Sequence, residues 1–451
     1  MIGDLFASPE AKIVVGLLYT VLAFVSPRAA LFVILPTTAI AGELRAGAVL
    51  FRPDDVMMAI LAISWGMRRL MSPPRPATPL DKPLLAYAAI GLVATLWGTA
   101  IGTADLTGLN KVTASGLHLL KRFEFVIYFF ILTDVLRSVA DVRRMLYVFM
   151  GSLVALSIFS FGRFQATGTI ALGPEGTPIH EPGLASMLNI GLALGLIVTS
   201  RSVRTNILAG ALLLASLWVL PFSLGRNYLS ATALMIVIVL FSRKRAMAFM
   251  LPLFVVLFYA AMLALPSTGL FPTNVGQRFS TLGSVFTSHA SASGVSLVDR
   301  LGPAVAHSWE VITSSPLVGW GLGSIALGSM DSEYATQMVY TGILGFAIFI
   351  WLVVRIARMV GTAYDVAQAQ DSPARPWIAG LQHCLLGYAL YSTFSPSISA
   401  ARAGAFFFTV LGLAAVLYHQ VVERPATEAA AEPAEELPSD QALDAAPQWT
   451  V

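Results

Sequence analysis

The chain has 451 residues, of which 56% are hydrophobic and 12% are charged, and its formal net charge is +3. With a mean hydropathy of +0.75, this composition is far more apolar than that of a soluble domain and predicts a membrane protein. The basic residues occur in short clusters and the net charge is weak, so nothing favours binding to nucleic acid.

Apolar runs that can cross a hydrocarbon core as helices recur along most of the chain. They lie at 13–26, 29–42, 54–70, 83–102, 116–135, 143–163, 183–200, 205–222, 226–242, 247–265, 334–357, 376–394 and 402–420. The first two could form a single helix broken at Pro27. The sequence therefore predicts an all-α polytopic membrane protein with about 12–13 transmembrane helices.

Lysine and arginine alternate between the ends of these spans in a way that predicts orientation. They collect in short segments at 66–76, 141–145, 200–204, 242–246 and 355–359. By the positive-inside rule these segments are cytoplasmic. The loop 164–182 and a long, partly helical loop at 266–333 are then periplasmic, and the C-terminus is cytoplasmic.

Four regions follow from this arrangement. Residues 1–265 hold the first ten spans, 266–333 form the large periplasmic loop, and 334–420 hold the last three spans. Residues 421–451 are rich in Ala, Pro and Glu and predict a disordered acidic tail. Cys384 is the only cysteine, which excludes an intramolecular disulfide and a Cys-x-x-Cys zinc site, and we expect it to pack as a small apolar residue.

Three arginines on the predicted outer side suggest an anion site. Arg226, in "SLGRNYLS", lies about one turn inside an apolar span, where a guanidinium is costly and usually faces a cavity or a partner. Arg278 and Arg300 lie in the long loop. Guanidinium groups bind phosphate oxygens in pairs, so a cluster of the three would suit a pyrophosphate. The alternative is that Arg226 snorkels to the surface and the other two are solvated.

The long loop also contains a predicted helix and a glycine turn. Residues 301–315 form an amphipathic pattern in which Val305, Trp309 and Ile312 share one side, and Pro316 ends it. The glycines that follow, Gly319, Gly321 and Gly323, permit close approach of the backbone to a ligand or to another helix.

Other polar residues near the outer side are candidates for chemistry. Asp331 could remove a proton from a sugar hydroxyl, or it could, like Ser332, cap the next helix. Candidates for substrate binding are His180, Glu181, Trp309, Tyr334 and Tyr340, although interfacial aromatic residues and solvated loop residues are common.

Lys121, Arg122 and Glu124 stand near the start of another span. We expect them to form either a mutually neutralised cluster or part of the anion site.

The order of these motifs resembles that of the O-antigen ligase and O-antigen polymerase superfamily of bacterial inner-membrane proteins. The matching pieces are "SLGRNYLS", the loop with Arg300, Trp309 and "PLVGWGLG", and "DSEYATQMVYTGILG". The motifs match over residues 183–357, and elsewhere the likeness is in topology only. The resemblance implies a glycosyltransferase without metal or cofactor that uses glycans linked to undecaprenyl pyrophosphate, with Arg226 and Arg300 on the pyrophosphate. A chain-length regulator is a partner by the same analogy.

One departure from the family pattern directs the functional hypothesis. Ligases carry His-Asn at the start of the last motif, whereas this chain has Asp331 and Ser332. The sequence therefore favours a polymerase of exopolysaccharide or O-antigen units over an O-antigen ligase acting on lipid A-core. A non-enzymatic transporter or flippase for the same lipids is a third interpretation.

Overall fold

The computed structural model describes most of the helical core. The described residues are 9–40, 44–46, 49–73, 75–101, 111–167, 181–220, 226–243, 309–324, 332–393 and 395–424. The expected span at 247–265, most of the long loop and the part of the predicted tail after residue 424 lie outside these residues.

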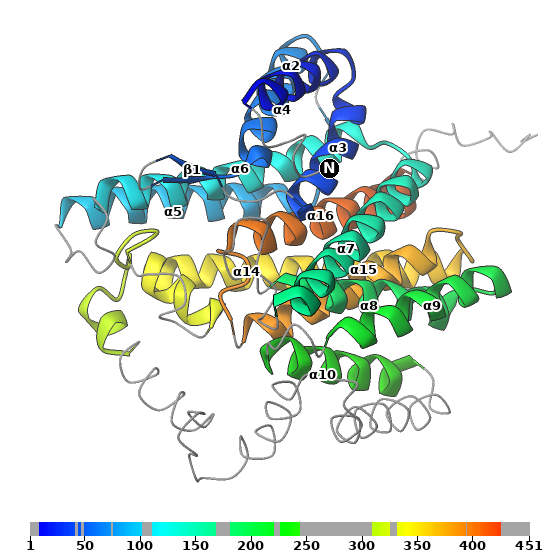
Figure 1. Cartoon of the computed structure of the whole chain (residues 1–451). Helices are drawn as coiled ribbons and strands as arrows, with labels where there is room; N and C mark the ends of the chain where they lie inside the picture. The colour runs from blue at the N-terminus through cyan, green and yellow to red at the C-terminus, as the bar shows by residue number, and fades with distance from the viewer. Residues whose placement is uncertain are drawn as a thin grey trace, which may run out of the picture.

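Helices make up nearly all of the described chain (Figure 1). Their bounds are α2 (Pro9–Val25), α3 (Pro27–Ile40), α4 (Pro53–Leu70), α5 (Asp81–Ala100), α6 (Lys111–Val135), α7 (Val139–Thr167), α8 (Glu181–Thr199), α9 (Val203–Val219), α10 (Arg226–Arg243), α14 (Glu333–Ala369), α15 (Arg375–Ser392) and α16 (Ala401–Tyr418). A π-helix, η3 (His419–Glu423), extends α16, and an antiparallel hairpin of β1 (Leu44–Ala46) and β2 (Val49–Phe51) joins α3 to α4.

Five of these segments are long and apolar enough to cross a membrane. They are Asp81–Ala100, Val139–Gly162, Pro182–Thr199, Glu333–Ala369 and Ala401–Glu423, and shorter apolar helices accompany them. The fold is thus that of an all-α polytopic membrane protein, as the sequence predicts. At the N-terminus, Ser26 separates α2 from α3, so the first two apolar runs form separate helices.

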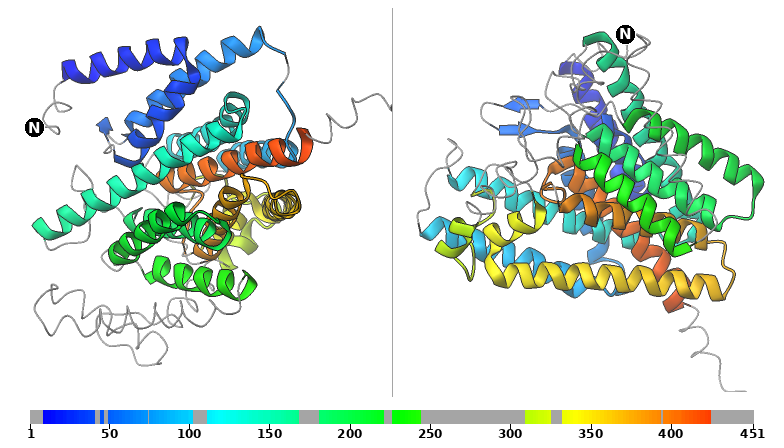
Figure 2. Two further views of the ribbon diagram at one scale, coloured as in Figure 1. Left: turned by 90° about the vertical axis from the view of Figure 1, so that its right-hand side faces the viewer. Right: turned by 90° about the horizontal axis from the view of Figure 1, so that it is seen from below.

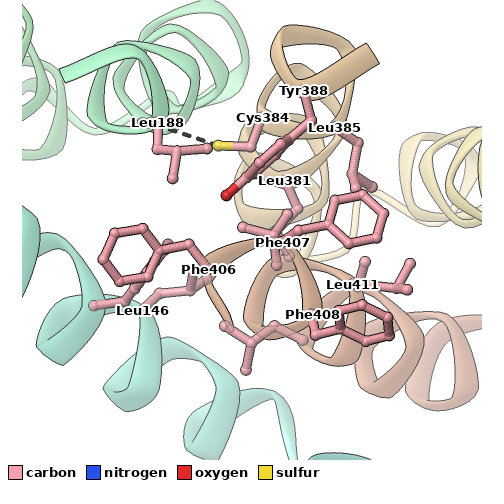
Figure 3. Packing of buried hydrophobic residues seen from close by; sticks show 14 of the residues in the cluster. Leu146, Leu188, Leu381, Cys384, Leu385, Tyr388, Phe406, Phe407, Phe408 and Leu411 are labelled. Carbon is pink, nitrogen blue, oxygen red and sulfur yellow. Dashed lines mark hydrogen bonds between the residues drawn. The ribbon is translucent and has the colours of Figure 1, made fainter. Parts of the chain in front are cut away.

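Close helix packing holds the core together (Figure 2). In the contact between α8 and α15, a Cβ at Gly195 would lie 2.1 Å from the backbone nitrogen of Gly380. Small residues at such contacts let two backbones approach, which is how helices gain packing energy where lipid is as apolar as the side chains. Cys384 is fully buried here, as expected, and its thiol donates to the carbonyl of Leu188 at 3.3 Å (Figure 3).

α14 reverses direction near its start, which the uninterrupted apolar pattern at 334–357 does not predict. Gly342 has φ 63° and ψ −168°, a conformation outside any helix. The rings of Tyr334 and Phe349 are 5.9 Å apart, whereas a straight helix would separate these residues by about 22 Å. Residues 333–341 therefore form a re-entrant arm that lies beside the long arm 343–369.

Candidate functional site

The re-entrant arm is held by the glycine turn that precedes it in the chain. The nitrogens of Trp320 and Gly321 donate to the carbonyls of Val339 and Tyr340 at 2.9 and 3.0 Å. Beyond the break, the nitrogen of Ile343 donates to Pro316 at 2.8 Å. These bonds satisfy backbone groups that the broken helix leaves without partners, which non-helical backbone requires inside a membrane protein.

The glycines of this turn serve contact between backbones. All three have positive φ, and a Cβ at Gly319 would lie 2.5 Å from the nitrogen of Gly342. On the other side, a Cβ at Gly98 of α5 would lie 2.0 Å from the carbonyl oxygen of Trp320. The turn is thus wedged between α5 and α14. The sequence allows these glycines to bring the backbone close either to a ligand or to another helix. Gly319 and Gly321 bring it close to other helices.

Glu333, the first residue of the re-entrant arm, is completely buried. One carboxylate oxygen accepts from the backbone nitrogens of Ile398 and Ser399 at 3.0 and 3.2 Å. The other accepts from the amide of Gln337 at 2.6 Å and from the hydroxyl of Ser399 at 2.7 Å. Four donors occupy the lone pairs of this carboxylate. Glu333 therefore fixes the chain that enters α16 and is poorly placed to act as a base.

Arg122 of α6 is a buried cation at the centre of the site, with only 6% of its surface exposed. Its guanidinium donates to the side-chain oxygen of Gln337 at 2.9 Å and stacks 4.1 Å from the centre of the Tyr87 ring. Gly91 of α5 leaves room for it, because a Cβ there would lie 2.9 Å from the arginine side chain. Among the described residues, no carboxylate lies within ion-pair distance of Arg122. A desolvated guanidinium without a carboxylate partner is suited to bind an anion.

A small cavity of about 20 Å³ opens beside Arg122. Its lining is Tyr87, His118, Lys121, Arg122, Phe125, Leu322, Tyr340, Ile398, Ser399 and Phe408. Among the described residues that line it there are two cations and one histidine but no carboxylate. The cavity has room for about one water molecule, or for one oxygen of a phosphate group.

Lys121 and Arg122 are neighbours in sequence but face different partners. Lys121 forms ion pairs with Glu124, at 3.0 Å, and with Asp55 of α4. Arg122 points toward Gln337 instead, because successive helical residues are rotated by about 100°. Of the three residues expected to form a cluster, Lys121 and Glu124 are thus in contact, and Arg122 is not part of that contact. An arginine within an apolar run is the sequence signal that identifies this position.

Several of the predicted site residues lie outside the described part of the chain. These are His180, Arg278, Arg300 and Asp331. Arg226 and Glu181 begin α10 and α8, and their side chains are likewise outside the description.

Three predicted aromatic residues lie in the described part of the chain, each in a different environment. Tyr340 lines the cavity, with its ring 6.3 Å from that of His118. Tyr334 donates its hydroxyl to the carbonyl of Ala389 at 3.3 Å. Trp309 is 64% exposed, on a short helix at 309–314 that ends before Pro316 as predicted.

The starts of α10 and α14 meet at the end of α15. The hydroxyls of Tyr391 and Tyr228 are 2.7 Å apart, and Tyr228 is two residues after Arg226. The hydroxyl of Ser332, next to Asp331, donates to the carbonyl of Ser392 at 3.4 Å. The backbone positions that flank two predicted site residues are therefore joined through the last turn of α15.

Comparison of the sequence with protein-family models and with curated proteins gave no match.

Proposed function

We propose that the chain is a membrane glycosyltransferase that polymerises glycan repeat units linked to undecaprenyl pyrophosphate at the periplasmic face of a bacterial inner membrane. The observation that carries the proposal is the cationic cavity with Arg122 at its base. A diphosphate departs as an anion, and fixed positive charge in a desolvated site stabilises a leaving anion strongly.

In the proposed reaction, a sugar hydroxyl of one lipid-linked unit attacks the anomeric carbon of the growing chain. The new glycosidic bond forms as the bond to the diphosphate breaks, and undecaprenyl pyrophosphate leaves with the electron pair. Asp331 accepts the hydroxyl proton in this scheme, because the saturated carboxylate of Glu333 is unsuited to that role. Arg122 joins the predicted Arg226, Arg300 and Arg278 in holding the diphosphate, and His180, Glu181, Tyr334 and Trp309 remain candidates for contacts with the glycan.

The motif that directs the choice of polymerase is the Asp331-Ser332 pair in place of His-Asn. Purified protein in lipid nanodiscs, supplied only with a lipid-linked oligosaccharide, should produce longer lipid-linked products. An O-antigen ligase would need a lipid A-core acceptor before any product formed.

A transporter of the same lipids is the second candidate, and the reversal at Gly342 is the observation that favours it. Broken helices with buried polar residues form the binding sites of many transporters. A transporter would move the lipid-linked oligosaccharide between the leaflets of a vesicle and leave its length unchanged. Chain extension in nanodiscs therefore separates the two functions.

A further inference from the structure

A second, smaller cavity lies between α3, α4, α6 and α16, and two carboxylates line it. Its volume is about 10 Å³, close to the size of a single water molecule. The polar lining consists of Thr38, Asp54, Glu124, Tyr128 and Thr409, and the rest is apolar.

One carboxylate oxygen of Asp54, which lines this cavity, accepts no hydrogen bond from the described residues. The residue is 5% exposed, and one carboxylate oxygen accepts from the guanidinium of Arg52 at 2.9 Å. The other oxygen is buried and has no hydrogen-bond partner among the described residues. Burial of a carboxylate oxygen without a hydrogen-bond donor costs free energy, so we expect a donor nearby.

Two of the three hydroxyls of the cavity, those of Thr409 and Tyr128, are in contact with each other. The hydroxyl of Thr409 donates to the carbonyl of Ala405 at 2.8 Å. It also lies 3.2 Å from the hydroxyl of Tyr128. None of the three hydroxyls, that of Thr38 included, is a hydrogen-bond partner of the buried Asp54 oxygen.

Glu124 is the remaining polar group, and its positive partner is shared. Both of its oxygens lie near the ammonium group of Lys121, at 3.1 and 3.0 Å. The same ammonium group is in contact with the carboxylate of Asp55. One lysine thus serves two carboxylates. If every acid here were ionised, Glu124 and Asp54 would face one cavity as like charges, which favours retention of a proton by one of them.

Further ionisable side chains lie on the elements around this cavity or next to them. Arg52 and Asp55 lie at the start of α4, and Arg402 lies one turn before Ala405 on α16. Tyr19 of α2 lies close enough to interact with Tyr128.

We propose that Glu124 is an intramembrane proton-binding site, with its proton donated to the free oxygen of Asp54 directly or through one water in the cavity. The proposal does not depend on the proposed glycan chemistry. Buried acids in membrane proteins commonly serve as proton sites. Here the proton would also set the charge balance at Lys121, which lines the cavity of Arg122. With Glu124 neutral, Lys121 is opposed by Asp55 alone, and the anion cavity keeps more positive charge.

Infrared spectroscopy of the purified full-length protein at neutral pH tests this directly. The wild type should show the carbonyl band of a protonated carboxylic acid, shifted in heavy water. Glu124→Gln should lose that band yet keep the thermal unfolding midpoint of the wild type, because glutamine replaces a neutral acid of the same shape. Asp54→Asn should keep the band at a shifted frequency, and it carries the test if Glu124→Gln does not fold.

Asp134→Asn is the matched control. Asp134 is a buried carboxylate with two guanidinium partners, Arg69 and Arg137, at 3.7 and 3.6 Å, so its replacement should leave the band unchanged. The proposal is wrong if the wild type lacks the band, if Glu124→Gln retains it, or if Asp54→Asn leaves its frequency unmoved. If sodium stabilised the protein and the band were absent, the site would bind a metal cation, and the proposal of a proton-binding site would be wrong.

Discussion

At the scale of single residues, the site contains two buried charged side chains, Glu333 and Arg122, and their roles differ. Glu333 accepts from four donors, whereas Arg122 donates to the amide oxygen of Gln337 and, at 3.5 Å, to the carbonyl of Tyr87, and stacks on an aromatic ring. A carboxylate whose lone pairs all accept hydrogen bonds has a structural role. If it were neutralised by a proton or an amide, a donor hydrogen would lie against the donors around it. A guanidinium with spare donors is a binding group. The chemistry of the site is therefore expected at Arg122 and its cavity.

Glu333→Gln should lower the free energy of unfolding by about 2–3 kcal/mol. The glutamine amide would place hydrogens against the nitrogens of Ile398 and Ser399 or against the amide of Gln337. Asp371→Asn is the control, because the Asp371 side chain is 63% exposed and its one ion pair among the described residues is with the exposed Arg201, a contact worth little. Thermal unfolding in detergent measures both, and equal midpoints for Glu333→Gln and the wild type would refute the structural role.

At the scale of elements, the reversal of α14 creates the site. Without it, Glu333 would stand about 14 Å from Gly342 along the helix axis, and Gln337 could not reach Arg122. The reversal depends on the conformation of Gly342 and on its contact with Leu317, whose carbonyl oxygen would lie 2.3 Å from a Cβ.

Gly342→Ala should therefore destabilise the protein by at least roughly 2 kcal/mol, because φ and ψ here are nearly restricted to glycine. Gly361 lies in the same helix and has nothing within 4 Å of a Cβ. Gly361→Ala should be neutral or slightly stabilising, since alanine is the better helix former. Unfolding midpoints that fall equally in the two variants would contradict the account of the reversal.

The sequence predicts the elements better than it predicts their directions. Composition and apolar runs identify the helices of the described chain, and Pro316 correctly marks the end of the loop helix. The reversal at Gly342 is not predicted, because the apolar run continues through it and glycine is common inside membrane helices. Arg122 is not separated from Lys121 and Glu124 for a related reason: the choice of partner depends on which face of α6 meets α14, and that is a tertiary contact.

At the scale of the whole molecule, the positive-inside rule predicts that Ser72 lies in the cytoplasm and Thr313 outside it. Both residues are exposed, and Cys384 is buried. In a Cys384→Ser background, an impermeant maleimide added to intact spheroplasts should label Thr313→Cys and spare Ser72→Cys until the cells are opened. Labelling in the reverse order would invert the orientation and remove the site from the periplasmic face.

The central claim is that Arg122 binds the diphosphate group of the lipid through one oxygen in its cavity, and a binding titration tests it most directly. Undecaprenyl pyrophosphate is titrated into nanodiscs that contain the wild type, Arg122→Gln or the surface control Arg201→Gln. Loss of one charge-assisted contact should weaken binding about tenfold in Arg122→Gln and leave the Arg201→Gln control unchanged. Equal affinity of the wild type and a folded Arg122→Gln would contradict the claim.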